Sequence, residues 1–156
     1  MNAVAERLMI KRTFKAPVER VYAAWTDAEQ IKRWFAPGDM SVPGAEADAR
    51  PGGRYRVQMS EGGGDCEFHT TGGVYREVIP NQRLVFTWQW QGSDLETLVT
   101  LDFKSLSANE TELTLRHEGF DSEDTREKHA QGWDGCLAKL AAFLDQDNGW
   151  QILDPE

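Results

Sequence analysis

The chain has 156 residues, and its 26 acidic and 17 basic side chains give a formal net charge of −9 at pH 7. This acidic balance repels a phosphate backbone and argues against nucleic acid as a partner. No apolar stretch approaches the roughly 20 residues of a membrane-spanning helix, so membrane insertion is not expected. We expect a single soluble domain over residues 1–156, with a core at about 8–145. No secretion signal is visible, which favours the cytoplasm.

The N-terminal part of the chain predicts one strand and two short helices. In residues 8–14 every second side chain would share one face, and Leu8, Ile10 and Phe14 make that face largely apolar, with Arg12 as the exception, which favours a strand. Pro17 suits the first turn of a helix, and the apolar residues after it follow helical spacing. Thr26 and Glu29 form a capping-box pattern, which predicts a second helix that Pro37 ends.

The middle of the chain predicts strands joined by tight turns. A short strand is expected near Ala45–Arg50, and Gly72-Gly73 predicts a bulge in a later strand. The turns recur at hairpin spacing, so the sheet should be largely antiparallel. The longer strands are expected at residues 55–59, 66–78, 84–90, 99–103 and 113–117.

The C-terminal part predicts the longest helix. Asp121 or Ser122 can cap its start, and Asn148-Gly149 is expected to end it. Its buried face should be a stripe at spacings of three and four residues. That stripe consists of His129, Trp133, Leu137, Leu140 and Leu144.

Together these elements predict an α+β fold in which a curved antiparallel sheet of six to seven strands wraps around the long C-terminal helix. Two short helices follow the first strand. Many of the side chains that face inward are large and aromatic. They either form a close-packed core or line a pocket for an apolar ligand, and the pattern alone leaves both interpretations open.

Five segments in this order resemble those of a known family. They are residues 16–27 with Trp34-Phe35, then 51–55, 73–80, 83–88 and 129–133. The family is named for the C-terminal domain of the ATPase activator of the ninety-kilodalton heat-shock chaperone. It belongs to the START-like (SRPBCC) superfamily with the helix-grip fold, which also holds polyketide cyclases and lipid-transfer domains.

The resemblance implies a cavity between the sheet and the C-terminal helix. We therefore expect a small hydrophobic molecule as the partner, and neither a cofactor nor a metal. The residues expected to contact it are Trp25, Trp34, Phe35, Tyr55, Val57, Phe68, Phe86, Trp88, Leu101, His117, His129, Trp133 and Leu137.

Catalysis is a second hypothesis, of the polyketide cyclase or dehydratase type, with a pocket histidine or tyrosine as acid or base. His117 and His129 are expected to approach each other where the last strand leads into the helix. Cys136 lies about two helical turns from His129, too far for a nucleophile and its base. We therefore name no catalytic residue.

A third hypothesis is an interaction module, either linked to a chaperone or self-associating as a homodimer. The family name implies the chaperone. The eukaryotic activator, however, grips the chaperone with a separate N-terminal domain, for which we expect no counterpart here. That argues against chaperone association, while the homodimer stays open.

Overall fold

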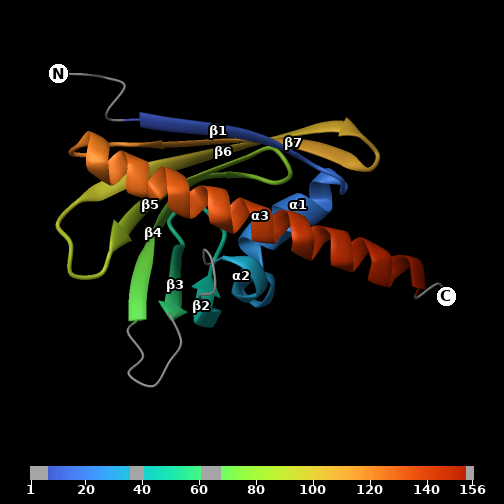
Figure 1. Cartoon of the computed structure of the whole chain (residues 1–156), viewed down its shortest axis with the longest axis horizontal. Helices are drawn as coiled ribbons and strands as arrows, with labels where there is room; N and C mark the ends of the chain where they lie inside the picture. The colour runs from blue at the N-terminus through green and yellow to red at the C-terminus, as the bar shows by residue number, and fades with distance from the viewer. Residues whose placement is uncertain (1–6, 36–40, 61–67, 154–156) are drawn as a thin grey trace.

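The computed structural model describes residues 7–35, 41–60 and 68–153, apart from the side chains of Ser41, Phe68 and residues 145–153. Within these ranges a curved seven-stranded sheet faces the long helix α3, and two short helices follow the first strand (Figure 1). The predicted α+β helix-grip fold is confirmed. The elements are β1 (Arg7–Phe14), α1 (Val18–Thr26), α2 (Ala28–Trp34), β2 (Ser41–Ala47), β3 (Arg54–Ser60), β4 (Phe68–Ile79), β5 (Arg83–Trp90), β6 (Glu96–Ser107), β7 (Glu110–Glu118) and α3 (Glu123–Leu153).

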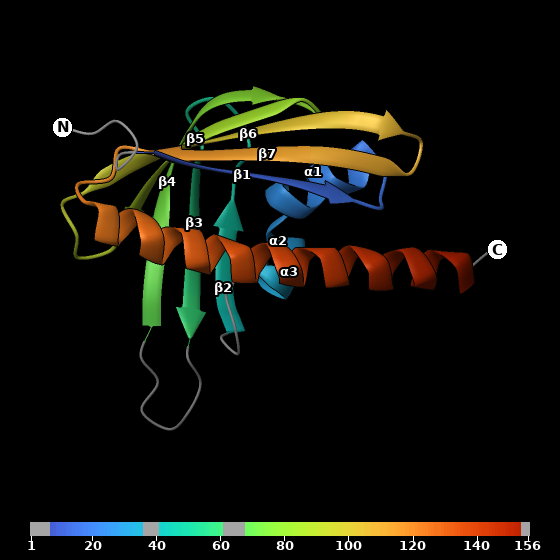
Figure 2. The same ribbon diagram turned by 45° about the horizontal axis from the view of Figure 1, so that its top comes forward.

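The strands pair antiparallel throughout, in the order β1-β7-β6-β5-β4-β3-β2. The sheet curves so far that β2, β3 and β4 run across the direction of β1 and β7, with α3 on the hollow side (Figures 1 and 2). Helices α1 and α2 also contact α3, and α2 packs against β2. The hollow side of the sheet is therefore covered by helices from both ends of the chain.

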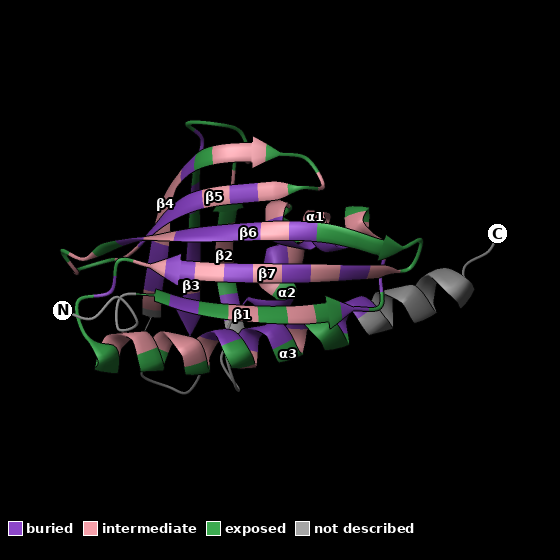
Figure 3. Ribbon diagram, turned by 90° about the horizontal axis from the view of Figure 1, so that it is seen from above, coloured by how far each residue is buried: buried purple, intermediate pink, exposed green. Residues whose placement is uncertain are grey.

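The inward face of the sheet is built from cross-strand rows of buried side chains. Leu84, Leu101 and Leu115 stand opposite one another on β5, β6 and β7. Phe86, Val99 and His117 form the next row in the same way. Figure 3 shows the alternation along β7, where buried residues alternate with less buried ones. The period of two follows from the pleat of a strand, so the alternating sequence placed these residues correctly.

Two predicted helix boundaries are wrong. Thr26 is the last residue of α1, and Asp27 caps α2 by accepting a hydrogen bond from the Glu29 backbone N–H at 3.1 Å. Asp27 has the extended backbone that an N-cap requires. Helix α3 runs to Leu153 through Asn148-Gly149. A glycine permits a helix to end but does not force it to, since its cost in a helix interior is only about 1 kcal/mol.

The predicted bulge at Gly72-Gly73 is also displaced. Both glycines pair in regular register with β3, and the register of β4 against β5 shifts between Tyr75 and Glu77. A Cβ atom on Gly73 would lie 2.1 Å from the carbonyl oxygen of Thr87. Gly73 therefore allows a close approach of two backbones, which is the other common reason for a glycine within a strand.

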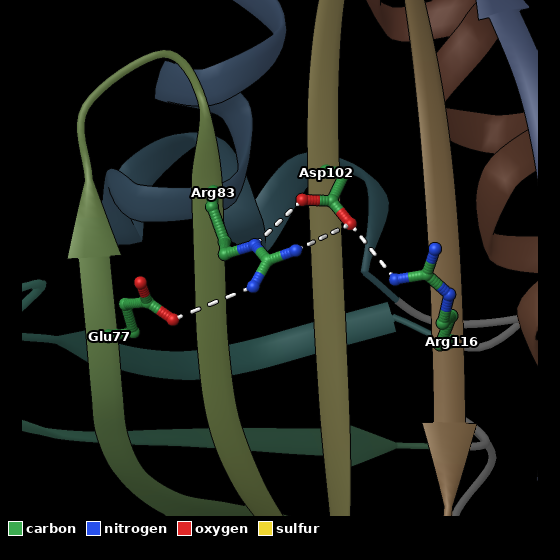
Figure 4. A network of polar contacts seen from close by, with 4 residues as sticks. All are labelled: Glu77, Arg83, Asp102 and Arg116. Carbon is green, nitrogen blue, oxygen red and sulfur yellow. Dashed lines mark hydrogen bonds and ion pairs between the residues drawn. The ribbon is translucent and has the colours of Figure 1, made fainter.

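A polar network crosses four strands on the outer face of the sheet (Figure 4). The Asp102 carboxylate accepts hydrogen bonds from Arg83 Nε at 2.8 Å and from Arg116 Nη1 at 3.1 Å. Arg83 also lies 3.8 Å from a carboxylate oxygen of Glu77. Asp102 thus joins β5, β6 and β7 through one side chain.

Replacing Asp102 with asparagine should lower the free energy of unfolding by about 1 kcal/mol, because two guanidinium groups lose their shared carboxylate. The groups are partly exposed, so a larger effect is not expected. Urea unfolding measures the change. The matched control is Glu96→Gln, which removes one negative charge from an exposed position on the same strand. Equal losses in both variants would show that the network adds nothing specific.

Candidate functional site

A pocket of about 500 Å³ lies between the first half of α3 and strands β3, β4 and β5. Phe35, which follows α2, closes part of it. Its walls are mostly aromatic and apolar, as is typical of small-molecule sites. The lining residues are Phe35, Met59, His69, Trp88, Trp90, Lys128, His129, Gly132, Trp133 and Cys136.

Helix α3 contributes half of this lining from one of its faces. Lys128, Gly132 and Cys136 follow each other at four-residue spacing, and His129 and Trp133 lie beside them. Apart from its chain neighbours and the nearby backbone of α3, no atom lies within 4 Å of the point where a Cβ of Gly132 would stand. The missing side chain of Gly132 therefore keeps part of the pocket open.

Aromatic rings from three elements pack together at the base of the pocket. Trp88 stacks on Phe35 with centroids 6.0 Å apart and lies 5.0 Å from Trp133. Trp90 meets Trp88 edge-on at 5.5 Å. Such pairs contribute stability beyond the burial of their apolar area, so the rings of this wall stabilise one another.

His117 is fully buried behind this wall. Its Nδ1 accepts a hydrogen bond from the indole N–H of Trp133 at 3.0 Å. Its Nε2 lies 2.6 Å from the Thr97 hydroxyl, which itself donates to the carbonyl oxygen of Trp88. A hydroxyl has one proton to donate, so the proton of this imidazole must be on Nε2.

His129 lies at the pocket, with its ring centroid 5.2 Å from that of His117. Its Nε2 accepts a hydrogen bond from the indole N–H of Trp90 at 2.9 Å. Its Nδ1 lies 2.9 Å from the carbonyl oxygen of Thr125, to which it donates. The predicted approach of the two histidines is thus confirmed, and each ring has a defined tautomer.

These bonds keep both imidazoles neutral. An indole N–H can only donate, so a proton on His117 Nδ1 or His129 Nε2 would place two donors face to face. Burial lowers the pKa of His117 well below its ordinary value, and the neighbouring His129 lowers it further. Burial also lowers the pKa of His129, against a smaller opposing effect of the Thr125 carbonyl. While these bonds last, neither ring has a nitrogen available to a substrate.

The other reactive groups near the pocket are equally constrained. Burial raises the pKa of the Cys136 thiol to about 12, which keeps it protonated. Among the described residues, no three histidine, cysteine or acidic side chains are grouped so that they could hold a metal ion. The described part of the pocket therefore offers apolar contact rather than an activated nucleophile.

A family model described as activator of Hsp90 ATPase homolog 1-like protein matches residues 15–145. The chain belongs to this family. The match covers most of the strands, both short helices and about the first three-quarters of α3, including all the residues that line the pocket. The resemblance noted in the sequence is therefore confirmed. No curated protein matches the chain by sequence.

Solved structures share the helix-grip fold of this family member over nearly its whole length. A protein from Chromobacterium violaceum is 29% identical, covers 88% of this chain and 96% of its own, and gives a TM-score of 0.76. The AHSA1 protein from Silicibacter pomeroyi is 25% identical, covers 90% and 99%, and gives 0.80. DynU16, a protein in the dynemicin biosynthetic locus, is 23% identical, covers 90% and 47%, and gives 0.72, which shows the fold alone.

The structure brings four of the predicted contact residues to the pocket: Phe35, Trp88, His129 and Trp133. His117 lies directly behind Trp133. The side chain of Phe68 lies outside the described residues. The others are buried in the core instead: Trp25, Trp34, Tyr55, Val57, Phe86, Leu101 and Leu137.

Tyr55 shows why the inward face of the sheet is larger than the pocket. Its hydroxyl donates to the Thr87 carbonyl oxygen at 2.6 Å, and its ring packs on Tyr75 and Phe86. Burial raises the pKa of Tyr55 well above its ordinary value. With its hydroxyl bonded to the backbone, Tyr55 belongs to the packing of the sheet.

Sequence reasoning missed six of the lining residues. Four of them carried a usable signal: Trp90 continues the alternation of Trp88, and Lys128, Gly132 and Cys136 are in helical phase with His129 and Trp133. Met59 and His69 stand opposite each other on β3 and β4, a pairing that only the register shows. The six are Met59, His69, Trp90, Lys128, Gly132 and Cys136.

Proposed function

We propose that this chain binds a small apolar or aromatic molecule in the pocket between α3 and strands β3, β4 and β5. The observation that carries the proposal is an open space of about 500 Å³ with indole and phenyl walls. A space of this size holds a small organic molecule. The cytoplasmic location expected from the sequence is part of the same proposal. Among the described residues, no helix has a stretch apolar enough to span a membrane.

Gly132 is the second support for this proposal. A glycine in a helix interior costs about 1 kcal/mol relative to alanine. Here it faces empty space where any side chain would reduce the volume of the pocket. The enzyme alternative has weaker support, since all four imidazole nitrogens of the histidine pair already have hydrogen-bond partners.

Ligand binding is testable through stability and fluorescence. A ligand present at a hundred times its dissociation constant should add about 2.7 kcal/mol to the free energy of unfolding. Because Trp88, Trp90 and Trp133 line the pocket, the same ligand should change the intrinsic tryptophan fluorescence. A screen of flat apolar compounds by thermal shift, with fluorescence titration of each hit, measures both.

Gly132→Leu should weaken binding about tenfold or more, because the added side chain occupies the pocket. The variant should fold at least as well as the wild type, since no atom obstructs its Cβ and leucine favours a helix. Ala138→Leu, at an exposed position of the same helix, is the matched control and should bind normally. Equal affinities in all three proteins would place the ligand elsewhere and contradict the proposed site.

A further inference from the structure

The ionisable side chains in the described lining of the pocket include no carboxylate, although the chain as a whole is acidic. The chain carries 26 acidic and 17 basic residues. The titratable residues in the described lining are His69, Lys128, His129 and Cys136, with no carboxylate among them. The neutral thiol and the neutral imidazole of His129 add no charge, so Lys128 contributes a full positive charge to an otherwise apolar site.

The hydrogen-bonding atoms of the pocket walls also favour one kind of ligand. Both nitrogens of His129 are occupied, and the indole N–H of Trp133 already donates to His117. The indole N–H of Trp88, by contrast, is buried and has no hydrogen-bond partner in the described structure. No ring nitrogen of His129, Trp133 or Trp88 is left as an acceptor, so these side chains offer nothing to the donor groups of a ligand.

Lys128 is placed where the pocket meets solvent. Its side chain is 74% exposed, yet it lines the pocket one helical turn before Gly132. Its ammonium lies 3.3 Å from a carboxylate oxygen of Asp124, which is itself 77% exposed. Exposed pairs of this kind are weak. An anionic group held at the opening by its own apolar body could therefore compete with Asp124 for the ammonium.

We propose that the ligand is a planar aromatic carboxylate, with its rings against the indoles of Trp88 and Trp133 and its carboxylate against the ammonium of Lys128. This inference rests on the proposed function and narrows it to a class of ligand. The two residues of the exposed ion pair then act in opposite directions: Lys128 favours the acid, and Asp124 competes with it.

The test compares two probes of the same shape, 2-naphthoate and the neutral 2-methylnaphthalene, by tryptophan fluorescence titration. Lys128→Met should weaken naphthoate about threefold to tenfold. Asp124→Asn should tighten naphthoate about twofold, because the competing carboxylate is gone. Neither change should alter the affinity for methylnaphthalene by more than about a third, and the preference for naphthoate should shrink as salt screens the charges.

Lys104→Met, at an exposed position on β6, is the control for losing one positive charge. Its naphthoate affinity should match that of the wild type. If methylnaphthalene binds and Lys128→Met leaves naphthoate unchanged, or shifts both probes equally, the carboxylate inference is wrong while the proposed function stands. If neither probe binds the wild type and the wider ligand screen is also negative, both fail.

Discussion

Replacing Trp133 with alanine should lower the free energy of unfolding by about 3–5 kcal/mol, as for other large-to-small changes in a core. Trp133 is buried on the inner face of α3, where its ring contacts Trp25, Phe35 and Trp88. The truncation leaves a space that these rings cannot fill without moving. It also leaves His117 Nδ1 buried without its donor, which adds to the loss.

Trp133→Phe separates these two effects. It keeps an aromatic ring but removes the indole N–H, so its cost should be smaller, about 1–3 kcal/mol, and should come largely from the orphaned nitrogen of His117. Equilibrium urea unfolding of both variants gives the two numbers. A loss below about 1 kcal/mol for the alanine variant would mean that the inner face of α3 packs less tightly than its burial indicates.

Most of the fold could be predicted from local patterns in the sequence. The alternation along β7 and the stripe on α3 each depend on residues a few positions apart, and both placed Leu115, His117 and Trp133 correctly inside. The error at the start of α2 arose where two side chains competed for one role. Thr26 and Asp27 are both good caps, and the extended backbone of Asp27 decided between them.

The site was harder to predict because it depends on pairings between distant segments. The hydrogen bond between Trp90 and His129 joins residues 39 positions apart, and it fixes the tautomer of the imidazole. Sequence patterns indicate that both side chains face inward, but they do not show which nitrogen is occupied. The extent of the pocket along β3 is also not visible in the sequence: Val57 and Met59 share a face of the strand, yet of the two only Met59 lines the pocket.

Stability should fall as the pH drops below about 6.5, the ordinary pKa of histidine, because the folded state resists protonation of His117 and His129. Burial lowers the pKa of both rings in the folded protein. The unfolded chain therefore binds more protons than the folded one below pH 6.5, and the free energy of unfolding decreases with falling pH. The loss continues until the pH reaches the lowered pKa values of the folded state.

The slope of the free energy of unfolding against pH identifies the groups that take up protons on unfolding. Each proton taken up on unfolding lowers the free energy of unfolding by about 1.4 kcal/mol per pH unit, so His117 alone should give a readily measured slope between pH 6 and 5. Apart from each other, the described contacts of the two rings are Thr97, Thr125, Phe120 and the surrounding indoles, and none of these side chains carries a negative charge that would stabilise a protonated ring. Urea unfolding of the wild type at several pH values, beside a His117→Gln/His129→Gln double variant, measures the effect.

The double variant should be less stable at pH 7.5 but should lose most of the slope below pH 6.5. A double variant as pH-dependent as the wild type would assign the acid sensitivity to carboxylates and contradict the neutral histidine pair.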